Sequence, residues 1–353
     1  MNMSISSWIK RWTKGGLISR QLFRLLILSL TIVVISACGG AAINNSNSLT
    51  PASSLADCHM VQHEMGEVSV PNEQQRVVTI LFSFVGNTLT LDVKPIGSTL
   101  PFDNSTGLTE PYISTETYLG DSVEGIHNVG QTHTPSLEKL LQLKPDLILA
   151  WNRSSATQIY TRLSEIAPTV LVPYQFANHW NHFDFIAEVL GREDAAQQAK
   201  DLYYQRIEEL KLALGNRYQN KQISVISSYS KGTIAYGQNS FVGSIFDDIG
   251  LKRPAAQDVR DESIAPGGAI RDISNESLEV LDGDILFCLT FGKDSTKAFQ
   301  ELQRKPLWRE LKAVQEGRVY FVSGETWIGA NLIAADAVLD DLYEYLVNTS
   351  QPQ

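Results

Sequence analysis

The chain has 353 residues, of which 43% are apolar and 19% are charged, and its formal net charge is −10. This length and composition predict a folded protein of two domains and exclude a largely disordered chain. The acidic balance, 39 Asp and Glu against 29 Lys and Arg, makes nucleic acid an unexpected partner.

Residues 1–37 have the pattern of a secretory signal peptide. Five Lys and Arg residues and no acidic residue precede an apolar run, Leu25 to Ile35. As a helix this run would span about 16 Å, which is too short for the ~30 Å hydrocarbon core of a bilayer. It ends in Ile-Ser-Ala-Cys38, which resembles a lipobox, so we expect cleavage before Cys38 and lipidation of its thiol. The alternative is an ordinary secretory signal with a chance cysteine near its cleavage site.

The mature chain is expected to work outside the cytoplasm, anchored to a membrane. Residues 38–57 predict a flexible tether between the lipid and the folded part. Without the signal peptide, 316 residues remain and the net charge becomes −15. The other two cysteines are Cys58, which precedes the first predicted strand, and Cys288, which lies in an apolar segment. A disulfide between them is open, although burial of Cys288 as a small core residue is the simpler interpretation.

Short apolar runs alternate with amphipathic segments along the mature chain. Such runs are typical of strands buried on both faces of a parallel sheet. The predicted strands are Val77–Phe82, Asp146–Ala150, Thr169–Val172, Ile223–Ser227, Asp284–Leu289 and Val319–Val322. The predicted helices are Ser136–Leu143, Ser154–Ile166, Phe241–Ile249 and Ala330–Leu346. This order predicts an α/β fold on both sides of the middle of the chain.

The middle of the chain has a different pattern. Residues 193–214 contain neither Gly nor Pro, and their apolar residues recur at helical spacing. The apolar stripe consists of Ala199, Tyr203, Ile207, Leu210 and Leu214. A helix of this length would measure about 33 Å, enough to bridge two lobes.

The two halves of the chain contain a matching segment. Glu138 and Glu276 are each followed, eight residues later, by an aspartate, Asp146 or Asp284, that opens a predicted strand. In each segment a serine, Ser136 or Ser274, is predicted to cap a short helix that ends at a Pro or Gly turn. General likeness between two αβ units is the alternative explanation, although it does not explain why both acids are glutamates.

Three stretches resemble the iron-siderophore and cobalamin binding proteins of ABC importers. They are VGQTHTPSLEKLLQLKPDLILAW at 129–151, LSEIAPTV at 163–170 and PLWRELKAVQEGRVYFV at 306–322. The resemblance extends from about Cys58 to Leu346. It implies an α/β protein of class III periplasmic-binding-protein type, with two Rossmann-like lobes joined by a single long helix. The N-terminal lobe would cover 58–190, the inter-lobe helix 191–216 and the C-terminal lobe 217–353.

The resemblance also implies a function and a partner. The protein would be a monomer that captures a ferric siderophore between its lobes, needs no cofactor and delivers this cargo to the permease dimer of an ABC importer. In the family, one glutamate on each lobe meets arginine on a permease subunit, and the matching residues here are Glu138 and Glu276. Such charge pairs fix docking geometry more than they add affinity. Cobalamin and haem are alternative cargoes in the same family.

Candidate ligand-binding residues follow from the edge at which open α/β sheets bind ligands, the carboxyl ends of the strands. Aromatic rings there can pack against a bulky chelate, and an arginine can bind its oxygens through two hydrogen bonds. The candidates are Ser83, Phe84, Gln131, His133, Trp151, Arg153, Tyr229, Tyr236, Phe291 and Trp327. Arg153 is the strongest single candidate, Arg260 and Arg271 are weaker, and core packing is the alternative for each aromatic residue.

Two other classes of protein compete with this interpretation. A carrier of bare zinc or manganese needs several converging His and carboxylate ligands. The pairs His59/His63 and His179/His182 have suitable spacing, but the first precedes the predicted fold and the second enters a helix, so no metal site is expected. An enzyme is the second alternative. The chain lacks the common nucleophile-elbow, phosphate-loop, dinucleotide-binding and zinc-protease motifs, and we expect no catalysis.

Overall fold

The computed structural model describes residues 58–100, 118–152, 154–173, 179–229, 232–259, 268–274 and 277–348. The predicted signal peptide, Cys38 and the tether lie outside these residues. So do Arg153, Arg260 and Glu276.

The first lobe contains a six-stranded sheet with the strand order β6-β5-β4-β3-β7-β8. Its strands are β3 (Val77–Ile80), β4 (Gly97–Leu100), β5 (His127–Gln131), β6 (Thr134–Pro135), β7 (Leu147–Trp151) and β8 (Thr169–Val172). The short edge strand β6 is antiparallel to β5, and the other neighbouring strands are parallel. Its helices are α2 (Ser83–Thr90), η4 (Gly120–Val123), α3 (Leu137–Leu143), α4 (Ser154–Ser164) and α5 (His179–Leu190). Helices α3 and α4 pack on one face of the sheet, and α2 and α5 pack on the other.

A separate hairpin precedes this sheet. Strands β1 (Cys58–His63) and β2 (Gly66–Pro71) pair antiparallel, and β1 lies beside β8. Val61 and Val70 are buried in the main core. Cys58 and His63, expected to precede the first strand of this lobe, instead belong to β1.

The second lobe contains a five-stranded sheet with the order β11-β10-β9-β12-β13. Its strands are β9 (Ile223–Tyr229), β10 (Gly232–Tyr236), β11 (Ala269–Ile273), β12 (Ile285–Thr290) and β13 (Val319–Ser323). Strands β9, β12 and β13 are parallel, whereas β10 and β11 form an antiparallel edge. Its helices are α7 (Phe241–Ile249), η5 (Ala255–Gln257), η7 (Leu278–Leu281), α8 (Gly292–Gln303), α9 (Pro306–Glu310), α10 (Lys312–Gln315), α11 (Gly324–Trp327) and α12 (Leu332–Leu342). A π-helical segment, η8 (Tyr343–Asn348), continues α12.

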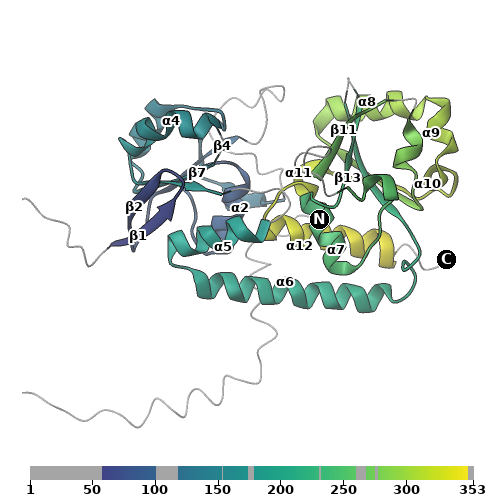
Figure 1. Cartoon of the computed structure of the whole chain (residues 1–353), viewed down its shortest axis with the longest axis horizontal. Helices are drawn as coiled ribbons and strands as arrows, with labels where there is room; N and C mark the ends of the chain where they lie inside the picture. The colour runs from purple at the N-terminus through teal and green to yellow at the C-terminus, as the bar shows by residue number, and fades with distance from the viewer. Residues whose placement is uncertain are drawn as a thin grey trace, which may run out of the picture.

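Helix α6 (Glu193–Leu214) joins the lobes and has the predicted bounds. All five residues of its predicted apolar stripe are buried. Figure 1 shows α6 running beneath both lobes. Lys200 forms an ion pair of 2.6 Å with Asp184 of α5 in the first lobe. On the side of the second lobe, the Tyr203 hydroxyl donates to Asp248 of α7 at 2.7 Å.

Helix α12 returns from the second lobe to the first. Its N-cap, Asn331, accepts a hydrogen bond from Ala334 N at 3.0 Å and donates to the Tyr118 hydroxyl of the first lobe at 2.6 Å. His182 of α5 donates from Nε2 to Ala330 O at 3.1 Å. Burial lowers the pKa of His182 to about 4, so its ring is neutral at ordinary pH. The segment around Ala330 is therefore a second junction between the lobes.

The main hydrophobic core is continuous through this junction. One cluster of contacting buried residues includes Phe84 and Phe183 of the first lobe, Leu210 of α6, and Phe246 and Leu339 of the second lobe. Separate clusters cover the outer face of each sheet. The lobes are thus joined by packing as well as by α6.

The matching segments of the two halves have a structural counterpart. Asp146 accepts hydrogen bonds from the backbone N–H groups of Gln75 and Arg76, just before β3, and Asp284 accepts one from Gln222 N at 2.8 Å, just before β9. Each aspartate therefore holds the start of the neighbouring parallel strand. The predicted caps differ: Ser136 caps α3 through Lys139 N, whereas Ser274 bonds to Ser277 and the second helix is the short 3₁₀ turn η7.

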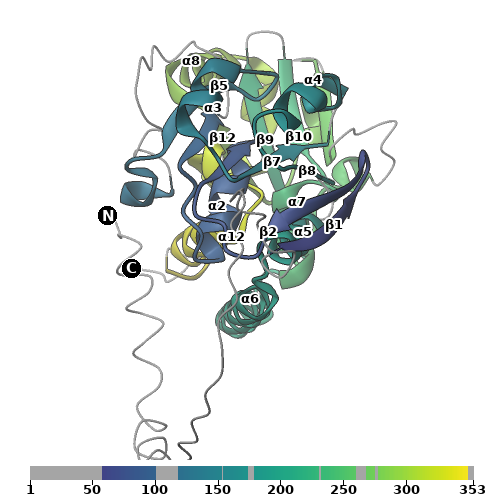
Figure 2. The same cartoon turned by 90° about the vertical axis from the view of Figure 1, so that its left-hand side faces the viewer.

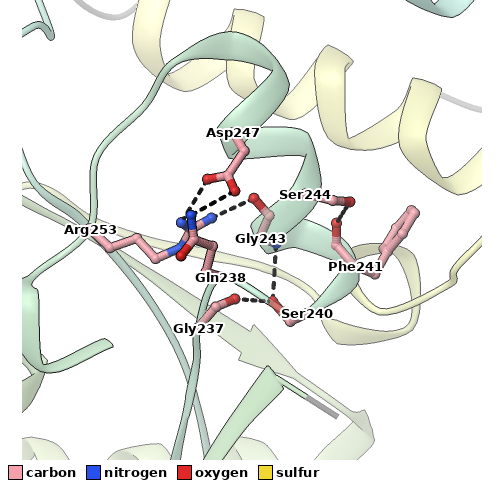
Figure 3. A network of polar contacts seen from close by, with 8 residues as sticks. All are labelled: Gly237, Gln238, Ser240, Phe241, Gly243, Ser244, Asp247 and Arg253. Carbon is pink, nitrogen blue, oxygen red and sulfur yellow. Dashed lines mark hydrogen bonds and ion pairs between the residues drawn. The ribbon is translucent and has the colours of Figure 1, made fainter. Parts of the chain in front are cut away.

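A buried arginine fixes the chain that follows α7. Arg253 donates to Asp247 Oδ1 at 3.0 Å and to Gly243 O at 2.5 Å (Figure 3). Its guanidinium also lies 5.7 Å from the centroid of the Phe246 ring. Ser240 caps the same helix by accepting from Gly243 N at 3.0 Å. The segment after α7 is thereby attached to that helix.

Candidate functional site

The carboxyl ends of the parallel strands place several predicted site residues at one edge of each sheet. In the first lobe Ser83 opens α2 directly after β3, Gln131 ends β5, and Trp151 ends β7. In the second lobe Tyr229 ends β9 and Phe291 follows β12. The chain after β13 continues through α11 to Asn331, which bonds to Tyr118 of the first lobe, and α12 packs beside α2. Residues 101–117 after β4, Arg153 after β7, residues 174–178 after β8 and residues 230–231 after β9 lie outside the described residues.

Ser83 carries a hydroxyl that is suited to a ligand. Its Oγ is buried and has no hydrogen-bond partner among the residues that the structure describes. Helix α2 begins without a side-chain cap, since the residue before Ser83 is Phe82. The first turn of this helix therefore offers a polar group at the expected edge of the sheet.

The remaining candidates at this edge differ in exposure. Gln131, Tyr229 and Phe291 are partly exposed, and His133 is exposed in the turn between β5 and β6. The Phe291 ring packs over Gly324, where a Cβ atom would collide with it. Trp151 is 8% exposed and belongs to the main core. Because Gln131, His133, Tyr229 and Phe291 are at least partly exposed, they stay in the proposed ligand set. Trp151 also stays in the set, as its least exposed member.

Three aromatic predictions need correction. Phe84 and Trp327 are 0% exposed in the main core, where the Trp327 ring lies 4.6 Å from that of Phe287. They do not present their side chains to a ligand in this conformation. Tyr236 was expected at the carboxyl edge, but β10 runs antiparallel to β9, so it lies toward the opposite end of the sheet, with its hydroxyl 3.2 Å from Ser227 Oγ. We leave these three residues out of the proposed ligand set.

Trp327 has a polar partner within the core. Its Nε1 donates to Asp341 Oδ2 of α12 at 2.7 Å. Burial raises the pKa of Asp341 to about 6, and the hydrogen bond from Trp327 opposes this effect only in part. The Trp327–Asp341 hydrogen bond connects α11, which follows β13, to α12.

Glu138 lies at the surface of the molecule on α3. It is exposed in the first turn of this helix, and Gln142 Nε2 lies 3.4 Å from its Oε1. Figure 2 shows α3 at the end of the molecule opposite α6. The carboxylate is therefore accessible to a partner at that end.

Comparison with known families matches residues 107–326 to the periplasmic binding proteins. The chain belongs to this family. A relative from Bacillus subtilis, the probable siderophore-binding lipoprotein YfiY, is 29% identical over 94% of this chain and 99% of its own length.

Solved periplasmic binding proteins share the fold. A FhuD fold-family component of a Fep/Fec-like ferrichrome ABC transporter from Bacillus subtilis has a TM-score of 0.67 and 25% identity, covering 81% of this chain and 99% of its own. Staphylococcus aureus SirA complexed with staphyloferrin B has a TM-score of 0.66 and 24% identity, covering 82% and 98%. The predicted family and the two-lobed α/β fold are confirmed. As a periplasmic binding protein, the chain is a substrate-binding component of a transporter and not an enzyme.

Three of the four histidines considered as metal ligands have partners within the protein, and the side chain of His179 lies outside the described part of the structure. His59 bonds to Asn72, His63 Nε2 lies 3.3 Å from the Tyr160 hydroxyl, and His182 bonds to Ala330 O. Within the described ranges, no group of three or more His, Cys, Asp and Glu residues is arranged to hold a metal ion. Cys58 and Cys288 are both free thiols, and Cys288 is buried in β12 as expected of a core residue. None of the helices in the described part of the chain is both long and apolar enough to span a bilayer.

Sequence reasoning missed the junction formed by Tyr118 and Asn331. Asn331 stands directly before the apolar run of α12, which is the usual signal for an N-cap. Its bond to Tyr118 could not have been inferred, because the two residues are separated by 213 positions.

Proposed function

We propose that this chain captures a ferric siderophore between its two lobes and presents it to an ABC importer. The observation that carries this proposal is the match of residues 107–326 to the periplasmic binding proteins, in a chain whose two α/β lobes are joined at Asn331. Open α/β sheets bind ligands at the carboxyl ends of their strands. The name of the relative YfiY supports a siderophore as cargo. The proposed ligand residues are Ser83, Gln131, His133, Trp151, Arg153, Tyr229 and Phe291.

The first experiment is a titration of a soluble form of the mature chain that lacks Cys38, residues 39–353. Ferric and metal-free hydroxamate, catecholate and citrate siderophores would be added, along with cobalamin, haem and zinc, and binding followed by tryptophan quenching and calorimetry. Tight binding of one ferric chelate, weaker without iron, is expected. Binding of cobalamin or haem alone would change the cargo, and saturable binding of zinc alone would overturn the proposal.

Variants at Ser83 and Arg153 then locate the site. Ser83→Ala is expected to weaken binding of the chelate a few-fold, the usual effect of one lost hydrogen bond. Arg153→Ala should weaken it more, because it would lose two charge-assisted bonds. Arg309→Ala, exposed on α9, serves as the matched control. Unchanged affinity in both site variants would place the ligand elsewhere.

Glu138 and Glu276 are the proposed docking residues for the two permease subunits. The double substitution Glu138→Ala with Glu276→Ala is expected to stop uptake in cells while leaving the ligand affinity of the purified protein nearly unchanged, because rim charges fix docking geometry. The control is Glu193→Ala with Glu208→Ala, two exposed acids of α6 at the opposite end of the molecule (Figure 2). A parallel loss of uptake and of ligand affinity would contradict the assignment.

Cys38 is the proposed lipid anchor, and the protein is proposed to act as a monomer. In cells that produce the Cys38→Ala variant, the protein should leave the membrane fraction and take up no labelled fatty acid. The Cys58→Ala variant is the control, and it should stay in the membrane fraction. Retention of label in the Cys38 variant would contradict the anchor.

A further inference from the structure

The turn of the hairpin β1–β2 reaches the carboxyl end of β7 in the first lobe. Glu64, in this turn, accepts a hydrogen bond from the side-chain Nδ2 of Asn152. Asn152 directly follows Trp151, the last residue of β7, and its backbone N–H donates to Val172 O at 3.0 Å, at the end of β8. The hairpin therefore contacts the edge of the sheet at which the ligand is proposed to bind.

A second contact joins the same turn to helix α4. His63 Nε2 lies 3.3 Å from the Tyr160 hydroxyl, and the centroids of the two rings are 5.4 Å apart. His63 Nδ1 accepts from Met65 N at 3.3 Å, so the hydrogen of the neutral ring is on Nε2 and is donated to Tyr160. Burial lowers the pKa of His63, which favours this neutral form. The turn thus contacts the chain on both sides of Arg153 in the sequence, at Asn152 and at Tyr160.

The hairpin is attached to the core of the first lobe. Val61 of β1 and Val70 of β2 are buried in the main core, and β1 lies beside β8. The two strands pair without a register shift from Cys58 to His63. Gly66 closes the turn with a φ of 118°, a conformation that other residues rarely adopt. The position of the turn is therefore set by the fold before any ligand arrives.

We infer that Glu64 is a positioning residue for the ligand site. By binding Asn152 it fixes the connection between β7 and α4, which carries Arg153 of the proposed ligand set. The inference rests on the proposed function, because only that function assigns Arg153 to the ligand. Ordering a chain segment on binding costs free energy, and a segment that is already ordered avoids this cost. Glu64 therefore raises the affinity for the ferric chelate without contacting the chelate.

Hydrogen exchange of the Asn152 amide, followed by NMR in the absence of ligand, tests the support. Glu64→Ala in the soluble mature chain should exchange this amide about twofold to tenfold faster, the effect of one lost hydrogen bond. Glu64→Gln keeps an oxygen that can accept from Asn152, so it should exchange at the original rate. Glu67→Ala, at an exposed acid of the same hairpin, is the control. Unchanged exchange in Glu64→Ala would overturn the inference.

Calorimetry tests the consequence for binding, with ferric hydroxamate, catecholate and citrate siderophores as probes. The affinity of Glu64→Ala for the chelate that binds the original chain should be about twofold to tenfold lower. Glu64→Gln and Glu67→Ala should bind as the original chain does. Because Glu64 is exposed in a turn, these variants are expected to fold. An equal loss of affinity in Glu64→Gln and Glu64→Ala would show that the ligand needs the charge of Glu64, which would overturn the positioning role.

A double substitution separates a role through Asn152 from an independent one. Glu64→Ala combined with Asn152→Ala should weaken binding no more than Asn152→Ala alone, because either single change already breaks the same contact. Additive losses would overturn the inference, as would an unchanged affinity in Glu64→Ala. Failure of the proposed function has a different sign, since none of the ferric chelates would then bind the original chain, and the positioning role would fall with it.

Discussion

The bond between Trp327 and Asp341 places an ionisable group where its charge is poorly solvated. Because the pKa of Asp341 is about 6 in the folded protein and 3.8 ordinarily, the folded state binds the proton more tightly than the unfolded state does. The stabilisation that the protonated Asp341 side chain gives to the folded state is therefore complete below about pH 4, and it is lost as the pH rises through about 6. At neutral pH the ionised carboxylate lowers stability.

Asp341→Asn should remove this penalty while keeping an acceptor for Trp327 Nε1. The variant is expected to be more stable than the original chain by about 1–3 kcal/mol near neutral pH, with the lower part of this range favoured because Asp341 is partly exposed. The advantage should vanish below about pH 4. Urea unfolding at a series of pH values measures the difference, and Glu188→Gln, at an exposed acid of α5, is the control. A constant difference across the pH range would contradict this account.

Single residues also show why part of the site could not be predicted. An aromatic residue after a strand can face a ligand or the core, and nothing in the local sequence separates Phe291, which is partly exposed, from Trp327, which is buried. Tyr236 lies away from the predicted edge because β10 runs antiparallel to β9. The short connection between Tyr229 and Gly232 is the hairpin signal that could have revealed it.

Among the elements, the most regular segments were predicted best. Helix α6, helix α7 and strand β8 have the predicted bounds, because each is a continuous pattern between clear start and stop residues. The hairpin β1–β2 was missed because its outer face is polar and its apolar residues are few. Helix α12 was predicted as a segment, but its packing against α2 depends on contacts far apart in the chain.

The contact between α2 and α12 depends on a glycine. A Cβ atom on Gly86 would overlap the side-chain amide of Asn331, which caps α12. Gly86→Ala should therefore lower the free energy of unfolding by about 1–3 kcal/mol, through overpacking and loss of the cap. Chemical denaturation measures this cost.

A double substitution tests the cause. Asn331→Gly removes the colliding side chain, and glycine is an acceptable N-cap. The pair Gly86→Ala with Asn331→Gly should cost less than the sum of the two single substitutions. Additive costs would show that Gly86 is needed for another reason.

In the whole molecule, three connections oppose a wide movement of the lobes. These are helix α6, the continuous main core, and the bonds of His182 and Asn331 across the junction. A single rigid helix resists the bending that flexible double strands allow. Ligand binding is therefore expected to produce only a small rotation between the lobes.

Spin labels in the two lobes can measure this rotation. Exposed Arg162 on α4 and Arg309 on α9 are suitable positions, with Cys58 replaced by serine and Cys288 retained because it is buried. Pulsed EPR should show a change of less than about 5 Å on addition of the ferric chelate. A much larger change, or a large fall in the scattering radius, would contradict the prediction.

The continuous core also constrains how such a protein can diversify. Genetic recombination that exchanged one whole lobe with a relative would pair α2 of one parent with Asn331 and α12 of the other, and Gly86 leaves no space for a mismatch. Chimaeras with a crossover inside α6 should therefore fold poorly unless α12 is inherited with the first lobe. New cargo preferences would then arise more readily by changes at partly exposed positions of the carboxyl edges, such as Gln131 and Tyr229, than by exchange of a whole lobe.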